Sequence, residues 1–177
     1  MKLKYISFIL GILLAGCEGC NDDPLPLSEL EKLPPPTQDG KNTFGCLVDG
    51  KAWVTETSVD AFAFYQEGVL SITAGNNQNT ESIYIYMYDA NLIEQEYHLP
   101  KENANHFTSV AGLEQDKAPE CIFETTSDYH GKVEITHLDK RAGKWIISGT
   151  FEFEAYSSDC QKAIKVTDGR FDLTYAP

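Results

Sequence analysis

The stretch KWIISGTFEFEAY, residues Lys144–Tyr156, is the longest in the chain whose side chains alternate with a period of two. One face would carry Trp145, Ile147, Phe151 and Phe153, and the other would carry Thr150, Glu152 and Glu154. Successive side chains of a β-strand point to opposite faces, so this pattern is typical of a strand with one buried and one solvated face. The longest regular element of the chain is therefore predicted to be a strand.

Shorter segments with strand character lie on both sides of this stretch and are separated by turn signals. They are residues 43–48, 51–54, 61–65, 69–74, 82–88, 105–110, 121–126, 132–138, 163–167 and 170–175. We expect turns at Asp49-Gly50, Glu67-Gly68 and Asp168-Gly169, of which the Asp-Gly pairs are strong hairpin signals. About ten short strands without a convincing helix predict an all-β domain, a single antiparallel meander that forms a barrel-like body or a β-sandwich. Gly45 and Gly149, each inside a strand, suggest bulges or sharp bends.

The N-terminal residues have the layout of an export signal. Lys2 and Lys4 precede the apolar run 5–14, which is shorter than the roughly 20 residues needed to span a bilayer. Leu14-Ala15-Gly16-Cys17 follows and resembles a bacterial lipobox, the motif of lipoprotein signal peptides. The resemblance implies that the Cys17 thiol receives a diacylglyceryl group and that residues 1–16 are then removed. A thioether-linked Cys17 has no thiolate, so the Cys17-x-x-Cys20 spacing does not indicate a redox or metal pair.

Residues 17–42 are interpreted as a lipidated, acidic tether that contains five of the eight prolines. Proline-rich chain is extended, which would hold the domain away from the membrane. Leucines in the tether could instead dock on the domain and shorten its reach. The period-two pattern begins at Thr43, so residues 43–177 are predicted to form the all-β domain.

Three blocks of sequence resemble a family of envelope lipoproteins of unknown function from Bacteroidota. The blocks are LPPPTQDGKNTFGCLVDGKAW (Leu33–Trp53), SGTFEF (Ser148–Phe153) and VTDGRFDLTY (Val166–Tyr175). This resemblance implies an exported, lipid-anchored, all-β domain in a Gram-negative envelope. It carries over no catalytic residue, because none is established for the family.

The charge of the chain limits the classes of partner. Its 27 acidic and 14 basic residues give a formal net charge of −13 at pH 7. Nucleic acids and anionic membrane surfaces need a basic patch, so we expect neither as a partner. We expect a monomer, held in the outer membrane through its N-terminal lipid; the face, cell surface or periplasmic, is left open. Acidic residues beside Cys17 resemble the surface-export signals of such bacteria.

Exported proteins can form disulfides, and we expect the pair Cys121–Cys160. Cys121 begins a predicted strand and Cys160 lies in a loop that follows another. Closing this loop would stabilise the fold by roughly 4 kcal/mol in the chain-entropy model. Cys46, inside a strand, is interpreted as a small buried hydrophobic residue.

The sequence shows no catalytic constellation, and we expect neither an enzyme nor a cofactor. The four histidines, at positions 98, 106, 130 and 137, have no spacing typical of a metal site. Glu152 and Glu154 share a strand face and are retained as an unfavoured hypothesis for a glycoside hydrolase, whose acid and nucleophile or base are paired carboxylates. Two glutamates opposite an apolar row are also what a half-solvated strand shows.

The favoured functional hypothesis is a non-catalytic binding module for a protein partner or a glycan. Tyr84, Tyr86 and Tyr88 alternate with apolar residues and would form an aromatic stripe that could anchor either ligand. The stripe would be purely structural if a second layer covered it. The alternative is a lipocalin-like carrier of a small apolar ligand. Aromatic residues expected in the core could line or fill its cavity; they are Phe62, Phe64, Phe151 and Phe171.

Overall fold

The computed structural model describes residues 26–55, 57–76, 80–88, 91–102, 108–116, 120–140 and 145–176. The predicted signal peptide, Cys17 and His106 lie outside these described residues. Twelve strands and one short 3₁₀ turn, η1 (Leu30–Lys32), make up the described regular structure. The strands are β1 (Thr43–Val48), β2 (Lys51–Val54), β3 (Ala61–Gln66), β4 (Val69–Asn76), β5 (Glu81–Tyr88), β6 (Glu96–Leu99), β7 (Lys101–Glu102), β8 (Thr108–Gln115), β9 (Cys121–Glu124), β10 (Gly131–Asp139), β11 (Ile146–Ser157) and β12 (Lys162–Ala176).

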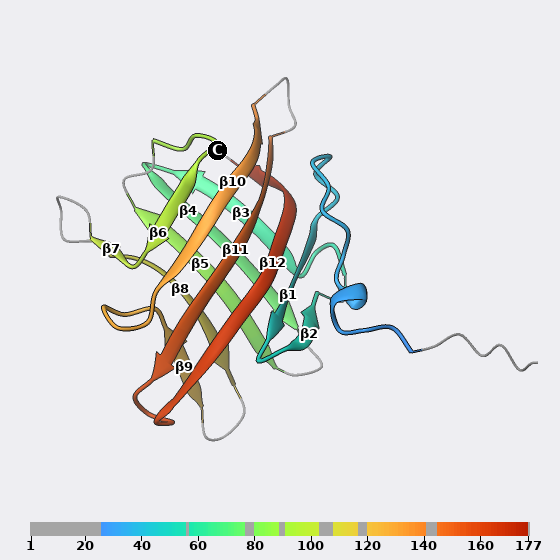
Figure 1. Cartoon of the computed structure of the whole chain (residues 1–177). Coiled ribbons are helices and arrows are strands. Elements are labelled where there is room, and N and C mark those ends of the chain that lie inside the picture. The colour runs from blue at the N-terminus through green and yellow to red at the C-terminus, as the bar shows by residue number, and fades with distance from the viewer. Residues whose placement is uncertain are drawn as a thin grey trace, which may run out of the picture.

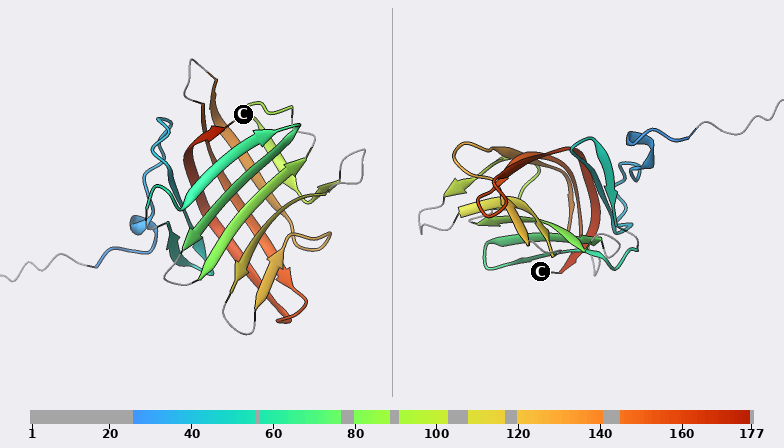
Figure 2. Two further views of the ribbon diagram at one scale, coloured as in Figure 1. Left: turned by 180° about the vertical axis from the view of Figure 1, so that it is seen from behind. Right: turned by 90° about the horizontal axis from the view of Figure 1, so that it is seen from below.

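The strands form one mostly antiparallel sheet that closes into a barrel-like ring, so the predicted all-β class is confirmed. The ring follows the order β12-β3-β4-β5-β8-β9-β11, and the pairing of β11 with β12 closes it. We call β3, β4, β5, β8 and β9 the back half, and β11, β12 and the strands attached to them (β1, β2, β6 and β10) the front half. Figures 1 and 2 show these halves as two layers that cross at an angle.

The strand order departs from a simple meander at several places. β12 returns to lie beside β1 at the start of the domain, and its last residues pair with β3 in parallel. After β5 the chain leaves the back half, and β6 pairs with β10 in the front half. Among the described residues no helix is long and apolar enough to cross a membrane.

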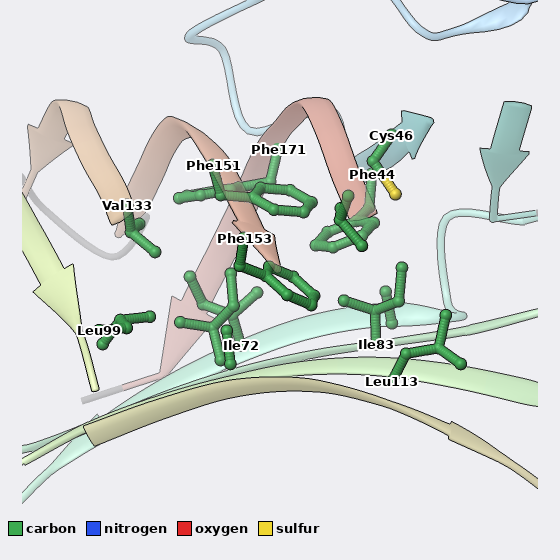
Figure 3. Packing of buried hydrophobic residues seen from close by; sticks show 14 of the residues in the cluster. Phe44, Cys46, Ile72, Ile83, Leu99, Leu113, Val133, Phe151, Phe153 and Phe171 are labelled. Carbon is green, nitrogen blue, oxygen red and sulfur yellow. The ribbon is translucent and has the colours of Figure 1, made fainter. Parts of the chain in front are cut away.

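The core lies between the two halves and is filled by apolar side chains from both. In Figure 3 the phenyl rings of the front half lie opposite the aliphatic side chains of the back half. The labelled residues include Phe44, Phe151, Phe153 and Phe171 on one side and Ile72, Ile83 and Leu113 on the other. The predicted period-two alternation of β11 is therefore confirmed: Phe151 and Phe153 are buried, and Glu152 and Glu154 are exposed.

One of the two Asp-Gly signals is a turn and the other is not. Asp49-Gly50 joins β1 to β2, and both residues have positive φ. Asp168-Gly169 lies inside the continuous strand β12, so the predicted turn there is wrong. At this point two residues of β12 face one residue of each neighbouring strand, which defines a β-bulge. Asp168, with a φ of 53°, absorbs the extra residue because β1 and β11 keep pairing on both sides.

A second strand ends later than the prediction. The sequence analysis places a strand at residues 105–110, of which 105–107 lie outside the described residues, and β8 runs from Thr108 to Gln115. The extension pairs with both β5 and β9, and these long-range pairings are not visible in the local pattern.

Gly149 and Gly45 sit where neighbours approach closely. A Cβ atom at Gly149 would lie 2.3 Å from the carbonyl oxygen of Glu134, opposite a bulge in β10. A Cβ atom at Gly45 would lie 2.7 Å from Cδ of Pro34, and the register shifts just after Gly45. The expected irregularities are therefore present beside both glycines.

The segment 33–42, which we call the arm, packs on the front half instead of extending from it. Leu33 is buried, and the carboxylate of Asp172, which is 1% exposed, accepts hydrogen bonds from the arm. The donors are Thr37 Oγ1 at 2.6 Å and the backbone N–H groups of Asp39, Gly40 and Lys41 at 2.8–3.2 Å. The sequence analysis begins the domain at residue 43, but the packed structure includes the arm.

Cys121 and Cys160, the pair expected from the sequence, form a disulfide with a Cα–Cα distance of 5.8 Å. It links β9 of the back half to the turn between β11 and β12 of the front half. Cys46 is a free thiol with no exposed surface, and burial raises its pKa well above the ordinary value. It is therefore a buried apolar residue and not a reactive thiol.

Candidate functional site

Strand β5 presents its tyrosines to the outside of the ring. Ile83, Ile85 and Met87 are buried in the core, so the alternation of the strand directs Tyr84, Tyr86 and Tyr88 outward. The ring centroids of Tyr84 and Tyr86 are 5.3 Å apart. The predicted tyrosine stripe is therefore brought together on the outer surface of the back half.

Tyr84 is held rigidly within this stripe. Its ring lies across Gly112 on β8, where a Cβ atom would come within 2.5 Å of the phenol. Its hydroxyl donates a hydrogen bond of 2.8 Å to Glu124 Oε1, and the side chain is only 9% exposed. Burial, followed by the hydrogen bond to Glu124, raises the pKa of Tyr84 well above its ordinary value. Tyr84 is thus mainly a structural member of the stripe, which leaves Tyr86 and Tyr88 for a ligand.

Two phenylalanines extend the aromatic surface, and they are not in the core as expected. Phe62 is 50% exposed and Phe64 is 40% exposed, because Ala61 and Ala63 take the inward positions of β3. The expectation that Phe62 and Phe64 line or fill the interior is therefore wrong.

Cross-strand register places these side chains in rows across the back half. Phe64 pairs with Ser71, and Ser71 pairs with Tyr86. In the next row Phe62 pairs with Thr73, and Thr73 pairs with Tyr84. The phenylalanines of β3 and the tyrosines of β5 therefore flank the small residues of β4. Because neighbouring strands are about 4.8 Å apart, each phenylalanine lies about 10 Å from the tyrosine in its row.

We call this surface the aromatic face and define it as Phe62, Phe64, Tyr84, Tyr86, Tyr88 and Ile122. Ile122, on β9, is 46% exposed and lies on the same outer side. The outward positions beside it hold carboxylates, Glu114 on β8 and Glu124 on β9. The left view of Figure 2 faces these strands. The surface thus combines large apolar groups with an acidic border.

The signal that locates Phe62 and Phe64 on the outside is the hairpin register. The Glu67-Gly68 turn pairs Tyr65 with Leu70 and Ala63 with Ile72. Directly paired residues share a face, so the inward aliphatic side chains of β4 force Ala63 inward as well. Composition alone would place the larger phenyl rings in the core.

The outer face of the front half is charged. Glu152 and Glu154 are exposed and are brought near lysines: Lys132 Nζ is 3.5 Å from Glu152, and Lys165 Nζ is 3.0 Å from Glu154. Both glutamates of the pair therefore lie on the exposed surface within ion-pairing distance of a lysine.

The interior of the ring is packed. Phe151 and Phe171, which the lipocalin-like alternative places around a cavity, have centroids 6.3 Å apart within the core cluster. A hollow of about 20 Å³ lies between β5, β6 and β8, beside Met87, Tyr97 and Leu99. That volume is close to the minimum for one water molecule.

Three of the four histidines lie within the described residues. His98 is near Glu96 and His137 is near Glu94, while His130 lies in the loop before β10. Within the described ranges, no three His, Cys, Asp or Glu side chains are grouped so that they could hold a metal ion.

Comparison with known proteins gives a family match. The model of one protein family, described as "Domain of unknown function (DUF6252)", matches residues 41–173, which span β1 to β11 and most of β12. No curated protein and no solved structure matches the chain.

Proposed function

Because the chain belongs to the DUF6252 family of domains of unknown function, we propose its function from its own geometry. The protein is a lipid-anchored envelope module that binds a protein partner through the aromatic face. The observation that carries this proposal is the outward position of Phe62 and Phe64, in register with Tyr84 and Tyr86. Exposed phenyl groups contribute little to folding, whereas they are suited to an interface.

The composition of the aromatic face favours a protein as the ligand. Protein interfaces concentrate tyrosine and phenylalanine at their centre and place polar groups at the rim. Here Tyr86 and Phe64 are central, and Glu114 and Glu124 lie at the border. With a net charge of −13, the chain should favour a partner whose contact surface is apolar with a basic rim.

The proposed anchor is the lipid on Cys17, which would place the domain at the outer membrane of a Gram-negative cell. The support is the lipobox at residues 14–17 and the apolar run before it, both outside the described residues. Several acyl chains hold a protein on a membrane far better than one chain does. Anchoring would confine the aromatic face to the membrane surface, where its partner would also be found.

Site-specific photo-crosslinking in intact cells tests the aromatic face. We replace Ile122 with p-benzoylphenylalanine and expect a covalent adduct of one discrete mass, whose partner is identified by peptide mass spectrometry. The purified partner should then bind the unmodified protein, and Phe62→Thr with Phe64→Thr should weaken that binding at least about tenfold, because central aromatic residues carry most interface energy. Added salt should also weaken binding if the basic rim is correct.

The matched control carries the same crosslinker at Thr150, an exposed position of the front half. Equal adducts from both positions, or binding unchanged by the phenylalanine substitutions, would overturn the proposal. Retention of the protein on immobilised neutral polysaccharide, lost in the same double variant, would instead identify the aromatic face as a glycan site.

Lipid attachment is tested separately. Labelled palmitate should be incorporated into the chain, and Cys17→Ser should abolish both labelling and membrane retention. Cys20→Ser is the control and should change neither. Labelling that persists in Cys17→Ser would contradict the proposed anchor and leave the aromatic face to be judged on its own experiment.

A further inference from the structure

A pocket of about 400 Å³ lies on the outer side of the front half, away from the aromatic face. It is centred on the bulge between β11 and β12, where the pairs Phe151–Gly169 and Phe153–Val166 leave Glu152 opposite two residues. Bulges re-aim side chains and are frequent beside functional sites. The volume is at the lower end of the range of small-ligand sites, about 300–1,000 Å³.

The wall at one end of the pocket is a fixed loop. Asp128 and His130 line it, and the N–H of Glu154 donates a hydrogen bond of 2.9 Å to the carbonyl of His130. Thr126 and Tyr129 exchange two backbone hydrogen bonds of 2.8 and 3.2 Å, which close the loop. A preorganised wall lowers the entropic cost of ligand binding.

Charges of both signs alternate around the pocket. Lys132 Nζ lies 3.1 Å from Glu96 and 3.5 Å from Glu152, while Lys165 pairs with Glu154. Because each lysine already has a carboxylate partner, an anionic ligand would meet no unpaired lysine in this lining. A hydroxyl group can accept a hydrogen bond from an ammonium group and donate one to a carboxylate, so a neutral molecule rich in hydroxyls matches this lining.

A pair of tyrosines lies close in sequence to residues that line the pocket. Tyr129 stands between the two lining loop residues, and Tyr156 follows Glu154 by two positions on the same face of β11. Their rings are stacked, with centroids 5.2 Å apart and planes 14° apart. The negative face of an aromatic ring attracts the polarised C–H groups of a sugar ring. A lining with few apolar and many polar groups, with an aromatic pair nearby, suits a carbohydrate better than an apolar ligand.

We propose that this pocket is a second binding site, for a neutral sugar residue. Lys132 and Lys165 donate hydrogen bonds to its hydroxyls, and Glu152 and Glu154 accept them. The site shares no lining residue with the aromatic face, although Tyr156 is the cross-strand partner of Glu124 at the border of that face. A molecule with both sites would bring a glycan and a protein partner together at one membrane surface.

The test is a titration of the full chain, labelled with nitrogen-15, followed by NMR. The probes are glucose, galactose, mannose and N-acetylglucosamine, and at least one should shift the amide resonances of Gly131, Glu152 and Thr167. Glu152→Gln with Glu154→Gln should weaken the binding at least about tenfold, because hydrogen bonds to charged groups are replaced by neutral ones. Phe62→Thr with Phe64→Thr is the matched control and should leave it unchanged.

A charged sugar makes the inference sharper. Galacturonate keeps the galactose ring and adds a negative charge, and because both lysines are already paired with carboxylates it should bind no better than galactose. Stronger binding of galacturonate, no shift with any neutral probe, or shifts unaffected by Glu152→Gln with Glu154→Gln would each overturn the proposal. None of these results bears on binding by the aromatic face.

Discussion

The front and back halves of the ring share one core but differ on their outer surfaces. On the front half the arm covers Asp172, and the remaining charged groups, such as Lys132 and Lys165, pair with carboxylates. On the back half Phe62 and Phe64 stand half exposed beside a row of tyrosines. The front surface is therefore polar and laced with ion pairs, whereas the aromatic face adds apolar exposure that folding does not need.

This difference separates residues that stabilise the domain from residues that are available for a partner. The arm belongs to the first group, because it satisfies a buried carboxylate with several hydrogen bonds. Phe62 and Phe64 belong to the second. Substitutions should therefore divide into those that lower stability and spare binding, and those that lower binding and spare stability.

The largest effect on stability is expected from the disulfide that joins the two halves. Cys121→Ser with Cys160→Ser should lower the free energy of unfolding by about 4 kcal/mol, because the unfolded chain is no longer closed over 39 residues. Urea denaturation followed by tryptophan fluorescence measures the loss. Partner binding should persist wherever this variant is folded. Binding that falls while the fold remains intact would show that the surface of one half depends on the link to the other.

Removal of the carboxylate beneath the arm should have the next largest effect. Asp172→Ala leaves the donors of residues 37–41 and of Ser148 without their acceptor, at a cost of about 3 kcal/mol. The arm should also become sensitive to trypsin at Lys32 and Lys41. The control Glu134→Ala, exposed on the same half, should change stability by less than about 0.5 kcal/mol. An arm that stays protected in Asp172→Ala would mean that other contacts hold it.

Acid should lower the free energy of unfolding by less than Asp172→Ala does, because a protonated carboxyl group at Asp172 still accepts some of these hydrogen bonds. Burial alone would raise the pKa of Asp172, but hydrogen bonds from Thr37, Ser148, Gly40 and Lys41 lower it below the ordinary value. A lowered folded-state pKa contributes stability that is complete above the unfolded-state value, about 3.9, and is lost as pH falls through the folded-state value.

The measurement is the free energy of unfolding between about pH 5 and pH 2 for the natural protein and Asp172→Asn. The natural protein should lose more stability over this range than the variant, because the amide that replaces the carboxyl group does not titrate. An equal loss of stability in the natural protein and in Asp172→Asn would contradict the proposed contribution of Asp172.

The sequence predicts elements well where local pattern and pairing agree. The alternation of residues 144–156 and the turn at Asp49-Gly50 both lead to the observed strands and hairpin. Asp168-Gly169 carries the same turn signal, yet it becomes a bulge because β1 and β11 hold the chain extended on both sides. A local signal cannot report such flanking strands, which come from distant parts of the sequence.

Only part of the candidate site can be predicted from the sequence, for a related reason. The tyrosine row is read from one strand, because Ile83, Ile85 and Met87 identify the inward face. Phe62 and Phe64 are larger than the alanines beside them, so hydrophobicity alone assigns them to the core. Their outward position follows from the register with β4, a pairing that must be known before the face of β3 can be assigned.

The smallest effect on stability, and the largest on binding, is expected from Phe62→Thr with Phe64→Thr. Threonine suits an exposed strand position, and the two phenyl groups are already 50% and 40% exposed, so stability should fall by no more than about 1 kcal/mol per site. Leu30→Thr, at a 48% exposed position on η1, is the matched control for loss of surface apolar area. If the aromatic face is the interface, the double variant loses the partner while Leu30→Thr keeps it. A loss of stability several times larger would instead mean that Phe62 and Phe64 support the back half, and the contrast between the two outer surfaces would then reflect folding after all.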